Sequence, residues 1–142
     1  MSQHVFVRNL GRMSYLSALE VQNQMANKIK ESMNSKNPLK GILLLVEHDP
    51  PVYTIGIRTK QYTIKDEEIL NKLGAEFYKT NRGGLITFHG LGQLVVYPIL
   101  NLKLFEPSIK WYVSQIEQSV IDLCNQFGLK GETSPHTGVW VR

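Results

Sequence analysis

The sequence has a single cysteine, no hydrophobic run long enough to cross a membrane and no cluster of metal-binding residues. One cysteine, Cys124, excludes an intramolecular disulfide and is typical of a reducing compartment. The longest continuous apolar run, residues 42–46, has the length of a strand and falls far below the roughly 20 residues that a bilayer requires. The four histidines are widely separated and match no metal-ligand spacing. We therefore expect no membrane contact and no bound metal.

Dense blocks of lysine and arginine are also missing, so we expect no nucleic-acid partner. Charge is nevertheless uneven, because residues 1–46 contain six basic and two acidic side chains whereas the remaining residues contain ten of each. This basic first third either steers an acidic protein partner through long-range attraction or is an ordinary solvated face. With 142 residues, 42% of them hydrophobic, the chain is long enough for one globular domain, residues 1–142.

The N-terminus lacks the apolar core of a secretory signal. It carries Arg8 and Arg12 and no acidic residue before Glu20, as a mitochondrial transit peptide does. Residues 4–8 nevertheless alternate like a strand, and Ser17 with Glu20 has the spacing of a capping box at the start of a helix. We therefore interpret these residues as part of the fold.

Periodicity and turn residues predict an α+β protein with a mixed or antiparallel sheet and helices packed on it. Two long helices are expected at residues 14–33 and 108–127, because apolar side chains recur there at three- and four-residue steps. The continuous apolar run of residues 41–47 predicts a strand that is covered on both faces. Further elements are a short helix at residues 66–73 and strands, some in hairpin-like pairs, at residues 5–7, 52–57, 75–80, 85–89 and 93–100.

Residues 82–93, with the sequence RGGLITFHGLGQ, combine two glycine-containing turns with a short strand. Glycines leave the backbone uncovered, so a ligand can approach the main chain there. Arg82 is placed to orient a carboxylate, phosphate or carbonyl, and strand alternation puts Thr87 and His89 on the face opposite Phe88. Such a slot suits an aliphatic chain that ends in a polar carbonyl. The same pattern also occurs as a purely structural hairpin, and it lacks the spacing of a phosphate loop.

The order Arg-Gly-Gly-x-x-Thr-Phe-His-x-x-Gly-Gln resembles the signature of LipB-type lipoyl(octanoyl) transferases. Residues 45–56 (LVEHDPPVYTIG), 93–102 (QLVVYPILNL) and 137–140 (TGVW) are similar to three further segments of that family, so the resemblance extends over nearly the whole chain. The sequences GAE at residues 74–76 and TFH at residues 87–89 resemble its animal mitochondrial branch. Leu91 departs from the pattern, because the family commonly has proline there, and this change should loosen the turn slightly.

This resemblance implies the fold shared by biotin and lipoate protein ligases, with residues 1–142 as the N-terminal part of one catalytic domain. It implies transfer of an octanoyl group from octanoyl-acyl carrier protein to a lysine of lipoyl domains, the first step of protein lipoylation, without ATP or another cofactor. The implied acceptors are the lipoyl domains of 2-oxoacid dehydrogenase complexes and the glycine cleavage H protein. The implied compartment is the mitochondrion, or the cytoplasm if the chain is bacterial.

By the same resemblance, one continuous segment binds the substrate: Arg82, Gly83, Gly84, Leu85, Ile86, Thr87, Phe88 and His89. The family's nucleophilic cysteine, and the lysine that lowers its pKa, follow the TGVW segment and would lie beyond Arg142. No catalytic residue is therefore expected within this chain, and the chain alone is expected to be inactive. Cys124 lies on the apolar stripe of the last predicted helix and is interpreted as a small buried hydrophobic residue.

Alternative functions remain open. A short, non-catalytic member of the family would bind acyl carrier protein or lipoyl domains without turnover. A lipoate- or biotin-type ligase would need a different glycine-rich signature and an adenylate site with a lysine in a later strand, and the arrangement of residues 87–93 argues against it. His89 is either a substrate contact with acid–base capacity or a hydrogen-bonded structural residue. Glu47 and His48 are interpreted as shaping a turn, and His136 as a loop residue.

Overall fold

The computed structural model describes residues 4–57 and 64–141, without the side chains of residues 64 and 65. The chain divides into two compact units, Met1–Asn101 and Leu102–Arg142. The predicted α+β class is confirmed, because the described residues form mixed and antiparallel sheets with three α-helices. That residues 1–142 act as one catalytic domain stays a prediction. Within the described ranges, no helix is both long enough and apolar enough to cross a membrane.

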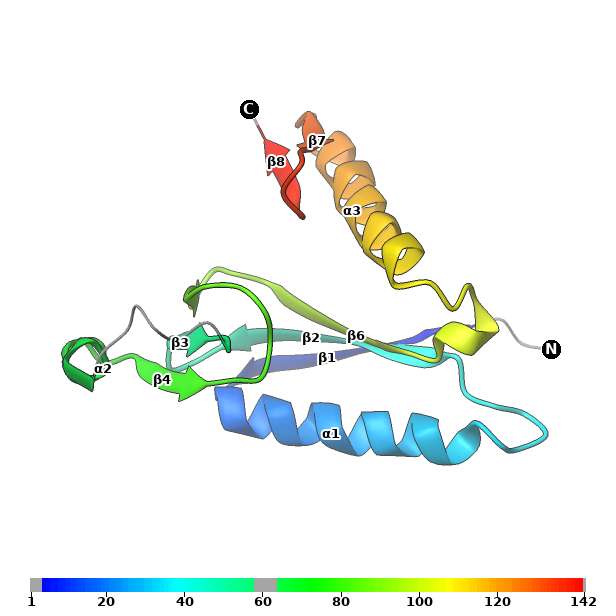
Figure 1. The fold of residues 1–142 in the computed structure, drawn as a ribbon, viewed down its shortest axis with the longest axis horizontal. Coiled ribbons are helices and arrows are strands. Elements are labelled where there is room, and N and C mark those ends of the chain that lie inside the picture. Colours follow the sequence, from blue (N-terminus) through cyan, green and yellow to red (C-terminus); the bar gives the residue numbers. More distant parts are fainter. Residues whose placement is uncertain (1–3, 58–63, 142) are drawn as a thin grey trace. The chain divides into compact units, whose positions relative to one another are not determined.

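The first unit contains two three-stranded sheets, each of them mixed (Figure 1). Its elements in chain order are β1 (Phe6–Met13), α1 (Tyr15–Ser32), β2 (Gly41–His48), β3 (Val52–Ile55), α2 (Ile64–Lys72), β4 (Glu76–Lys79), β5 (Thr87–His89) and β6 (Val95–Leu100). In the first sheet, of order β1-β2-β6, β1 is parallel and β6 antiparallel to β2. In the second, of order β4-β3-β5, β4 is parallel and β5 antiparallel to β3.

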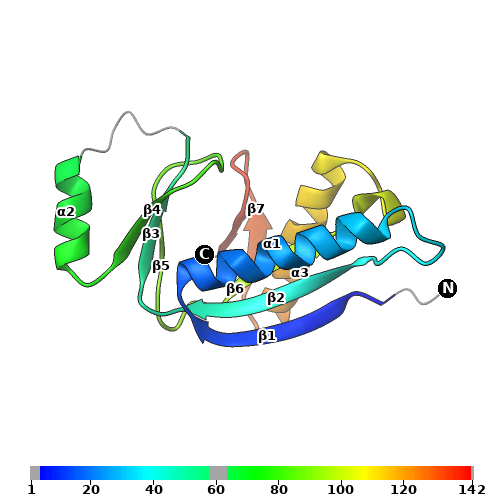
Figure 2. The ribbon, with the colours of Figure 1, turned by 90° about the horizontal axis from the view of Figure 1, so that it is seen from below.

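Helix α1 lies along one face of the β1-β2-β6 sheet (Figures 1 and 2). Strand β2 turns Leu44, Val46 and His48 into the core, where each is at most 1% exposed. The helix contributes the buried side chains of Ala18 and Ile29. The alternate residues of β2 from Leu43 to Glu47 are half-buried, so no residue of the strand is exposed on either face. This burial fixes β2 as the central strand that positions its last residue, His48.

Helix α1 begins one turn earlier than the predicted capping box. Its N-cap is Ser14, whose hydroxyl oxygen accepts a hydrogen bond from the Ser17 backbone N–H at 3.3 Å. Ser14 has extended backbone dihedrals, φ −62° and ψ 155°, as an N-cap residue requires. The spacing of Ser17 and Glu20 therefore indicated a nearby helix start correctly but assigned the cap to the wrong serine.

Replacing Ser14 with alanine should lower the free energy of unfolding by about 1 kcal/mol, because the first turn of α1 loses a backbone N–H acceptor. The matched control is Ser17→Ala, which removes only a side-chain hydrogen bond with the Ser14 hydroxyl. Urea denaturation of the two variants measures how much each serine contributes to the free energy of unfolding. A larger loss for Ser17→Ala than for Ser14→Ala would show that the capping-box assignment was right.

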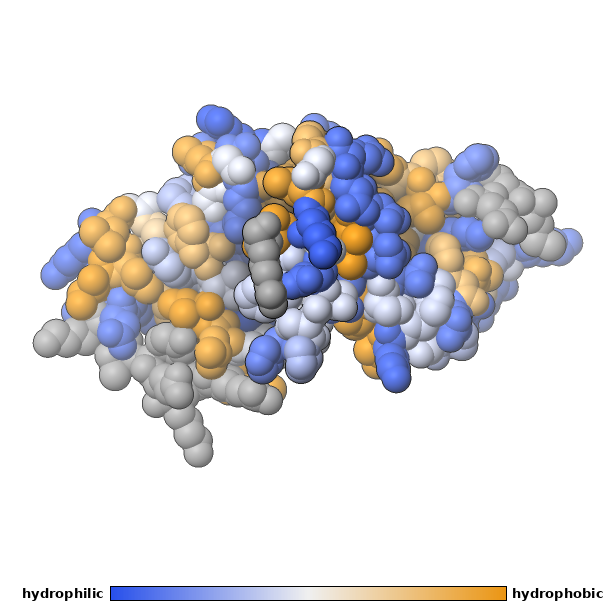
Figure 3. All heavy atoms as spheres, turned by 90° about the horizontal axis from the view of Figure 1, so that it is seen from above, coloured by the Kyte–Doolittle hydropathy of each residue, from blue (hydrophilic) through white to orange (hydrophobic). Residues whose placement is uncertain are grey.

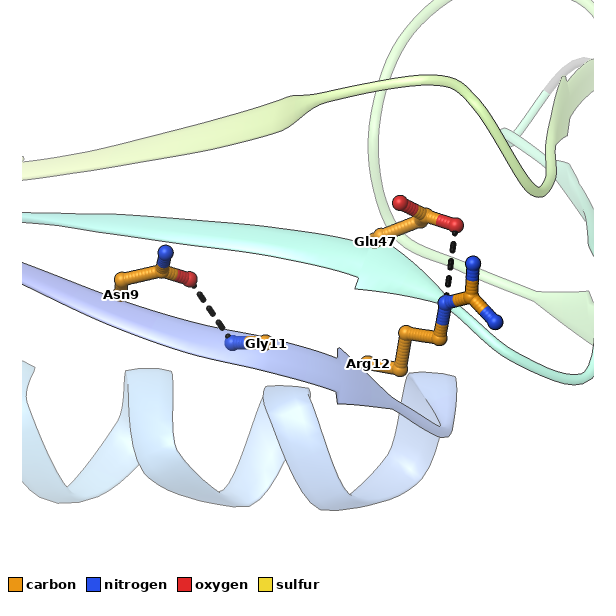
Figure 4. Close-up of polar contacts among 4 residues, drawn as sticks. All are labelled: Asn9, Gly11, Arg12 and Glu47. Atoms are coloured by element: carbon orange, nitrogen blue, oxygen red, sulfur yellow. Dashed lines mark hydrogen bonds and ion pairs between the residues drawn. The ribbon is translucent and has the colours of Figure 1, made fainter.

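Strand β1 is longer than predicted and carries an irregularity between Asn9 and Arg12, where its register to β2 shifts. Gly11 has φ +65° there, and its N–H donates to Asn9 Oδ1 at 2.8 Å (Figure 4). The Arg12 side chain then lies 3.2 Å from the carboxylate of Glu47 on β2 (Figure 4). A bulge and charged side chains on an outer strand disfavour pairing with another chain along that edge.

Hairpin-like pairs were expected in the middle of the chain, but the strands that include residues 87–89 and 95–100 do not pair with each other. Strand β5 pairs with β3, whereas β6 pairs with β2, so the two strands belong to different sheets. The turn at residues 90–93, closed by a hydrogen bond from the Gln93 N–H to the Gly90 carbonyl, connects the sheets instead. Gly92 has φ +81° in this turn, a conformation that glycine adopts without strain.

The second unit consists of a short 3₁₀ turn (Leu102–Leu104), helix α3 (Ile109–Gln126) and the antiparallel ribbon β7 (Gly131–Thr133) and β8 (Val139–Val141). Ser108 caps α3 by accepting from the Trp111 N–H, and Gly128, with φ +71°, follows its end as the sequence predicts. The apolar stripe of α3 is only partly covered, since Phe127 is 74% exposed. Hydrophilic and apolar residues are intermingled on the molecular face of Figure 3.

Candidate functional site

The β4-β3-β5 sheet brings together residues that are distant in sequence. Thr54 of β3 pairs with Thr87 of β5, and Val52 pairs with His89, so these four side chains share one face. Phe88 points to the other face, where its ring packs against Tyr53 with centroids 4.9 Å apart. The predicted alternation of Thr87 and His89 against Phe88 is therefore confirmed.

A pocket of about 270 Å³ lies against this face. Its lining residues come from α1, β3, the Arg82 turn, β5 and β6: Tyr15, Thr54, Arg82, Thr87, His89 and Tyr97. Three of them belong to the predicted motif, and the other three were missed. The similar segments 45–56 and 93–102 contain Thr54 and Tyr97, but nothing local in the sequence assigns either to a pocket.

The remaining predicted site residues do not line the pocket. Gly83 and Gly84 are exposed in the turn, Leu85 is exposed beside it and Ile86 is half-buried. Strand β5 begins only at Thr87, two residues later than expected, because residues 82–86 form the turn. The role of these residues in substrate binding stays a prediction.

The Arg82 side chain joins its own turn to strands β3 and β5 through hydrogen bonds, and this arrangement is called the Arg82 clasp below. Its Nη2 donates to the Thr54 carbonyl at 2.6 Å and to the hydroxyls of Thr54 and Thr87 at 2.9 and 3.0 Å. The same guanidinium donates to the carbonyls of Gly83 and Leu85 at 2.8 and 3.0 Å. Planar, multiple donation of this kind is specific to arginine. The structure therefore gives Arg82 a positioning role that its isolated place in the motif did not reveal.

Gly56, directly after β3, permits the turn to lie against the sheet. A Cβ atom there would lie 2.4 Å from the Arg82 carbonyl oxygen and 2.8 Å from that of Gly84. The Ile57 N–H donates to the same Arg82 carbonyl at 3.0 Å. Gly84 has φ +89°, so a larger residue there would be strained. Two glycines 28 positions apart in the sequence thus set the geometry of one turn.

A hydrogen bond joins the pocket-lining Tyr97 to His48, which is not in the lining. His48 Nε2 lies 2.8 Å from the Tyr97 hydroxyl, and His48 Nδ1 lies 3.3 Å from the Met13 carbonyl. The His48 ring also lies against Tyr15, with centroids 5.7 Å apart, and edge-on to His89 at 6.0 Å. Burial raises the pKa of Tyr97 to about 12, so its hydroxyl keeps its proton at neutral pH.

His89 is a half-buried imidazole with spare hydrogen-bonding capacity. Its Nδ1 is buried and has no hydrogen-bond partner among the described residues. Burial lowers the pKa of His89, and the neighbouring His48 and Arg82 lower it further, so the ring is neutral at pH 7. Burial also lowers the pKa of His48. Two neutral imidazoles therefore lie side by side at the pocket.

These two pKa shifts predict that acid destabilises the fold. Both histidines bind protons less readily when folded than when unfolded, so the free energy of unfolding should fall as the pH drops below the unfolded value of 6.5. The slope is at most about 1.4 kcal/mol per pH unit for each histidine. Urea denaturation between pH 7.5 and 5 measures it. His48→Gln should reduce the slope, whereas His136→Gln, in an exposed loop, should leave it unchanged; a flat profile for the wild type would contradict the shifts.

Most polar atoms of the pocket are already paired within the protein. The hydroxyls of Thr54 and Thr87 accept from Arg82, and the Tyr97 hydroxyl is bonded to His48. The other lining residues, Tyr15 and His89, add a phenol ring and an imidazole. Apolar walls with one imidazole suit a ligand that has an aliphatic chain and a single polar group.

The matching family model is the lipoyl protein ligase A/B catalytic domain, and it covers residues 14–142. The chain belongs to this family. All six pocket residues, including those outside the recognised motif, fall inside the matched range. The predicted fold class, that of biotin and lipoate protein ligases, is thereby confirmed together with the family resemblance.

Several relatives carry names that match the resemblance. The mitochondrial octanoyl-[acyl-carrier-protein]:protein N-octanoyltransferases of Danio rerio and Xenopus tropicalis are 54% and 49% identical over 94% and 96% of this chain. The octanoyltransferase of Solibacter usitatus is 41% identical over 95% of the chain. The chain spans 58%, 56% and 60% of these three proteins, respectively.

Solved structures of a lipoate-bound protein and of a lipoate-protein ligase share the fold. P. falciparum LipL1 in complex with lipoate superimposes with a TM-score of 0.67 at 18% identity, over 96% of this chain and 41% of that protein. Lipoate-protein ligase A bound with ATP gives a TM-score of 0.59 at 16% identity, over 96% and 52%. At these identities the likeness establishes the architecture of the lipoyl protein ligase family and nothing finer.

The described residues give little support to a reactive cysteine or a metal site. Cys124 is half-buried on α3 near Gly131 of β7, so it is less enclosed than predicted. In the part of the chain that the structure describes, no group of three His, Cys, Asp or Glu side chains is placed to hold a metal ion. The pocket at the Arg82 clasp therefore remains the best-supported functional site.

Proposed function

We propose that this protein transfers an octanoyl group from octanoyl-acyl carrier protein to a lysine of a lipoyl domain. The observation that carries the proposal is the pocket of residues 15, 54, 82, 87, 89 and 97, whose walls are largely carbon and include the half-buried imidazole of His89. Relatives at 41–54% identity named as octanoyltransferases support the choice of acyl group.

In the proposed reaction, the chain holds the octanoyl group and orients its carbonyl. The residues proposed to do so are Arg82, Gly83, Gly84, Leu85, Ile86, Thr87, Phe88 and His89, with Tyr15, Thr54 and Tyr97 added from the structure. Thr54 and Thr87, whose hydroxyls accept from Arg82, are proposed to contact the acyl chain through their methyl groups. His89 donates a ring N–H to the acyl carbonyl, an interaction that strengthens as negative charge develops on that oxygen.

The acyl transfer itself needs no ATP, because the thioester of the carrier is already activated. The acyl carbon leaves the carrier's sulfur, bonds to a cysteine thiolate and then bonds to the lysine nitrogen, while the released thiol takes up the proton that the amine loses. The family resemblance assigns this cysteine and a pKa-lowering lysine to positions after residue 142. Residues 1–142 contribute the acyl pocket.

The proposed partners are octanoyl-acyl carrier protein and the lipoyl domains of 2-oxoacid dehydrogenase complexes and the glycine cleavage H protein, in the mitochondrion. Their support is the similarity to animal mitochondrial relatives. The net charge of +4, which arises within residues 1–46, favours association with an acidic carrier.

A transfer assay tests the function. Protein expressed from the complete gene is mixed with octanoyl-acyl carrier protein and an unmodified lipoyl domain, and mass spectrometry follows the lipoyl domain. Octanoylation without ATP is the expected result. Modification that occurs only with free lipoate and ATP would identify a ligase instead, and binding of both proteins without modification would identify a non-catalytic family member.

A further inference from the structure

His48 is the most completely buried titratable group described around the pocket, yet it is not among the pocket-lining residues. It ends β2 and contacts a residue from each of four other elements: Met13 of β1, Tyr15 of α1, Tyr97 of β6 and His89 of β5. Its position was predicted only to shape a turn. The contacts instead connect the β1-β2-β6 sheet to the pocket on the β4-β3-β5 sheet.

The hydrogen bonds of His48 identify its tautomer. The Met13 carbonyl can only accept, so His48 Nδ1 carries a hydrogen and donates to it at 3.3 Å. A neutral ring with a hydrogen on Nδ1 leaves Nε2 as an acceptor. The Tyr97 hydroxyl, 2.8 Å away, therefore donates its proton to Nε2.

The Tyr97 oxygen is constrained from a second side. Gln22 on α1, whose amide donates to the Ala18 carbonyl at 3.3 Å, acts on the Tyr97 hydroxyl from another direction and lowers its pKa, against the larger effect of burial. The phenol thus gives its proton to His48. Its hydrogen is directed at His48, which does not line the pocket.

We propose that His48 is a positioning residue, which keeps the acyl pocket apolar by holding the Tyr97 proton and sets the orientation of His89 through their edge-on contact. This inference rests on the proposed function, since it assumes that the pocket holds the octanoyl chain. Without the Nε2 acceptor, the Tyr97 hydroxyl turns toward the pocket and exposes a polar group to that chain. An unpaired polar group against an aliphatic chain weakens binding.

Two substitutions separate the two hydrogen bonds of His48. His48→Asn retains a donor near Nδ1 for Met13 but removes the acceptor for Tyr97, whereas His48→Gln places an amide oxygen near Nε2 and can restore it. We expect His48→Asn to weaken octanoate binding by the 142-residue chain by about 3- to 10-fold, with recovery in His48→Gln. Tyr97→Phe should weaken binding less than His48→Asn, because it removes the hydroxyl that would otherwise turn toward the pocket and keeps the His48 ring beside His89. The double variant His48→Asn/Tyr97→Phe should lose no more than His48→Asn alone.

Calorimetry with octanoate measures these affinities on the folded fraction. The matched control is Tyr53→Phe, which removes a tyrosine hydroxyl on the opposite face of β3 and should leave the affinity unchanged. Losses that add in the double variant, or equal losses for His48→Asn and His48→Gln, would overturn the positioning role, because a merely structural histidine predicts both.

Nitrogen-15 spectra of the histidine rings test the tautomer independently of any ligand. At pH 7 the wild-type His48 should show a protonated Nδ1 and an unprotonated Nε2, whose resonance moves in Tyr97→Phe. A protonated Nε2 would refute the inference, even if octanoate binds. A chain with the expected tautomer that binds no octanoate would instead refute the proposed function. The ionisable groups facing His48 are Tyr15, Glu76, His89 and Tyr97, so spectra of His89→Gln identify which ring titrates.

Discussion

Replacing Arg82 with lysine should abolish octanoate binding and lower the free energy of unfolding by about 2–4 kcal/mol. The guanidinium donates to acceptors on β3, on β5 and within its own turn, all at 2.6–3.3 Å. A lysine ammonium keeps the charge but can at best take the place of Nη2, so it loses the Nη1 hydrogen bond to the Gly83 carbonyl, the Nε hydrogen bond to Thr54 and the planar geometry that aims these donors. The hydroxyls of Thr54 and Thr87 would then turn to other partners, and the pocket wall would lose its arrangement.

The matched control is Arg12→Lys. Arg12 is an arginine of the same unit, whose side chain is 65% exposed beside Glu47. Exposed ion pairs contribute little, so its stability change should stay below about 0.5 kcal/mol and octanoate binding should persist. Urea denaturation and calorimetry on both variants provide the comparison. If Arg82→Lys binds octanoate as the wild type does, the clasp is not what shapes the pocket.

Replacing Gly56 with alanine should displace the whole Arg82 turn. The added methyl group would lie 2.4 Å from one carbonyl oxygen and 2.8 and 3.0 Å from two more, all in the backbone of residues 82–84. Backbone contacts of that length are relieved only by moving the turn, which separates Arg82 from Thr54. We expect a loss of about 2–3 kcal/mol in stability and at least a tenfold loss of octanoate affinity.

Gly83→Ala is the steric control for stability, because a Cβ atom at Gly83 meets nothing within 4 Å. Its free energy of unfolding should differ from the wild type by less than about 0.5 kcal/mol. Thermal and urea unfolding compare the stability of Gly56→Ala with that of Gly83→Ala. Equal stabilities for Gly56→Ala and Gly83→Ala would mean that the turn does not rest on β3.

Local patterns predicted the helices and strands of the chain well. The periodicity of residues 108–127 gave α3 to within a residue at each end, and the polar and glycine residues around it gave both of its boundaries. The β2 strand followed from one apolar run. These elements are encoded in short windows, where side-chain spacing and capping groups act directly on the backbone.

Pairing between strands could not be predicted in the same way. The sequence indicated hairpin-like pairs in the middle of the chain, yet His89 pairs with Val52 and Tyr97 pairs with Leu44. Which strands become neighbours depends on the burial of whole sheet faces, a property of the assembled unit. Half of the pocket was missed for this reason, since Tyr15, Thr54 and Tyr97 reach it from three other elements.

The role of Arg82 shows a second limit. A cation beside two glycines in a motif of this family is naturally interpreted as a ligand contact. The structure gives its donors acceptors within the protein, in particular the Thr54 hydroxyl 28 residues away. A local motif identifies the residue that matters, whereas only the fold distinguishes a residue that contacts the ligand from one that holds the pocket in shape.

The central claim, that an octanoyl chain lies against Thr54 and Thr87, is tested most directly by nuclear Overhauser effects. The 142-residue chain is prepared in deuterated form, with ordinary hydrogen only in its threonine methyl groups. Octanoate that is not deuterated is then added. We predict cross-peaks from the octanoate methylenes to the methyl groups of Thr54 and Thr87, and their loss in Arg82→Lys. Cross-peaks that involve only other threonines, such as Thr133 or Thr137 of the second unit, would contradict the account.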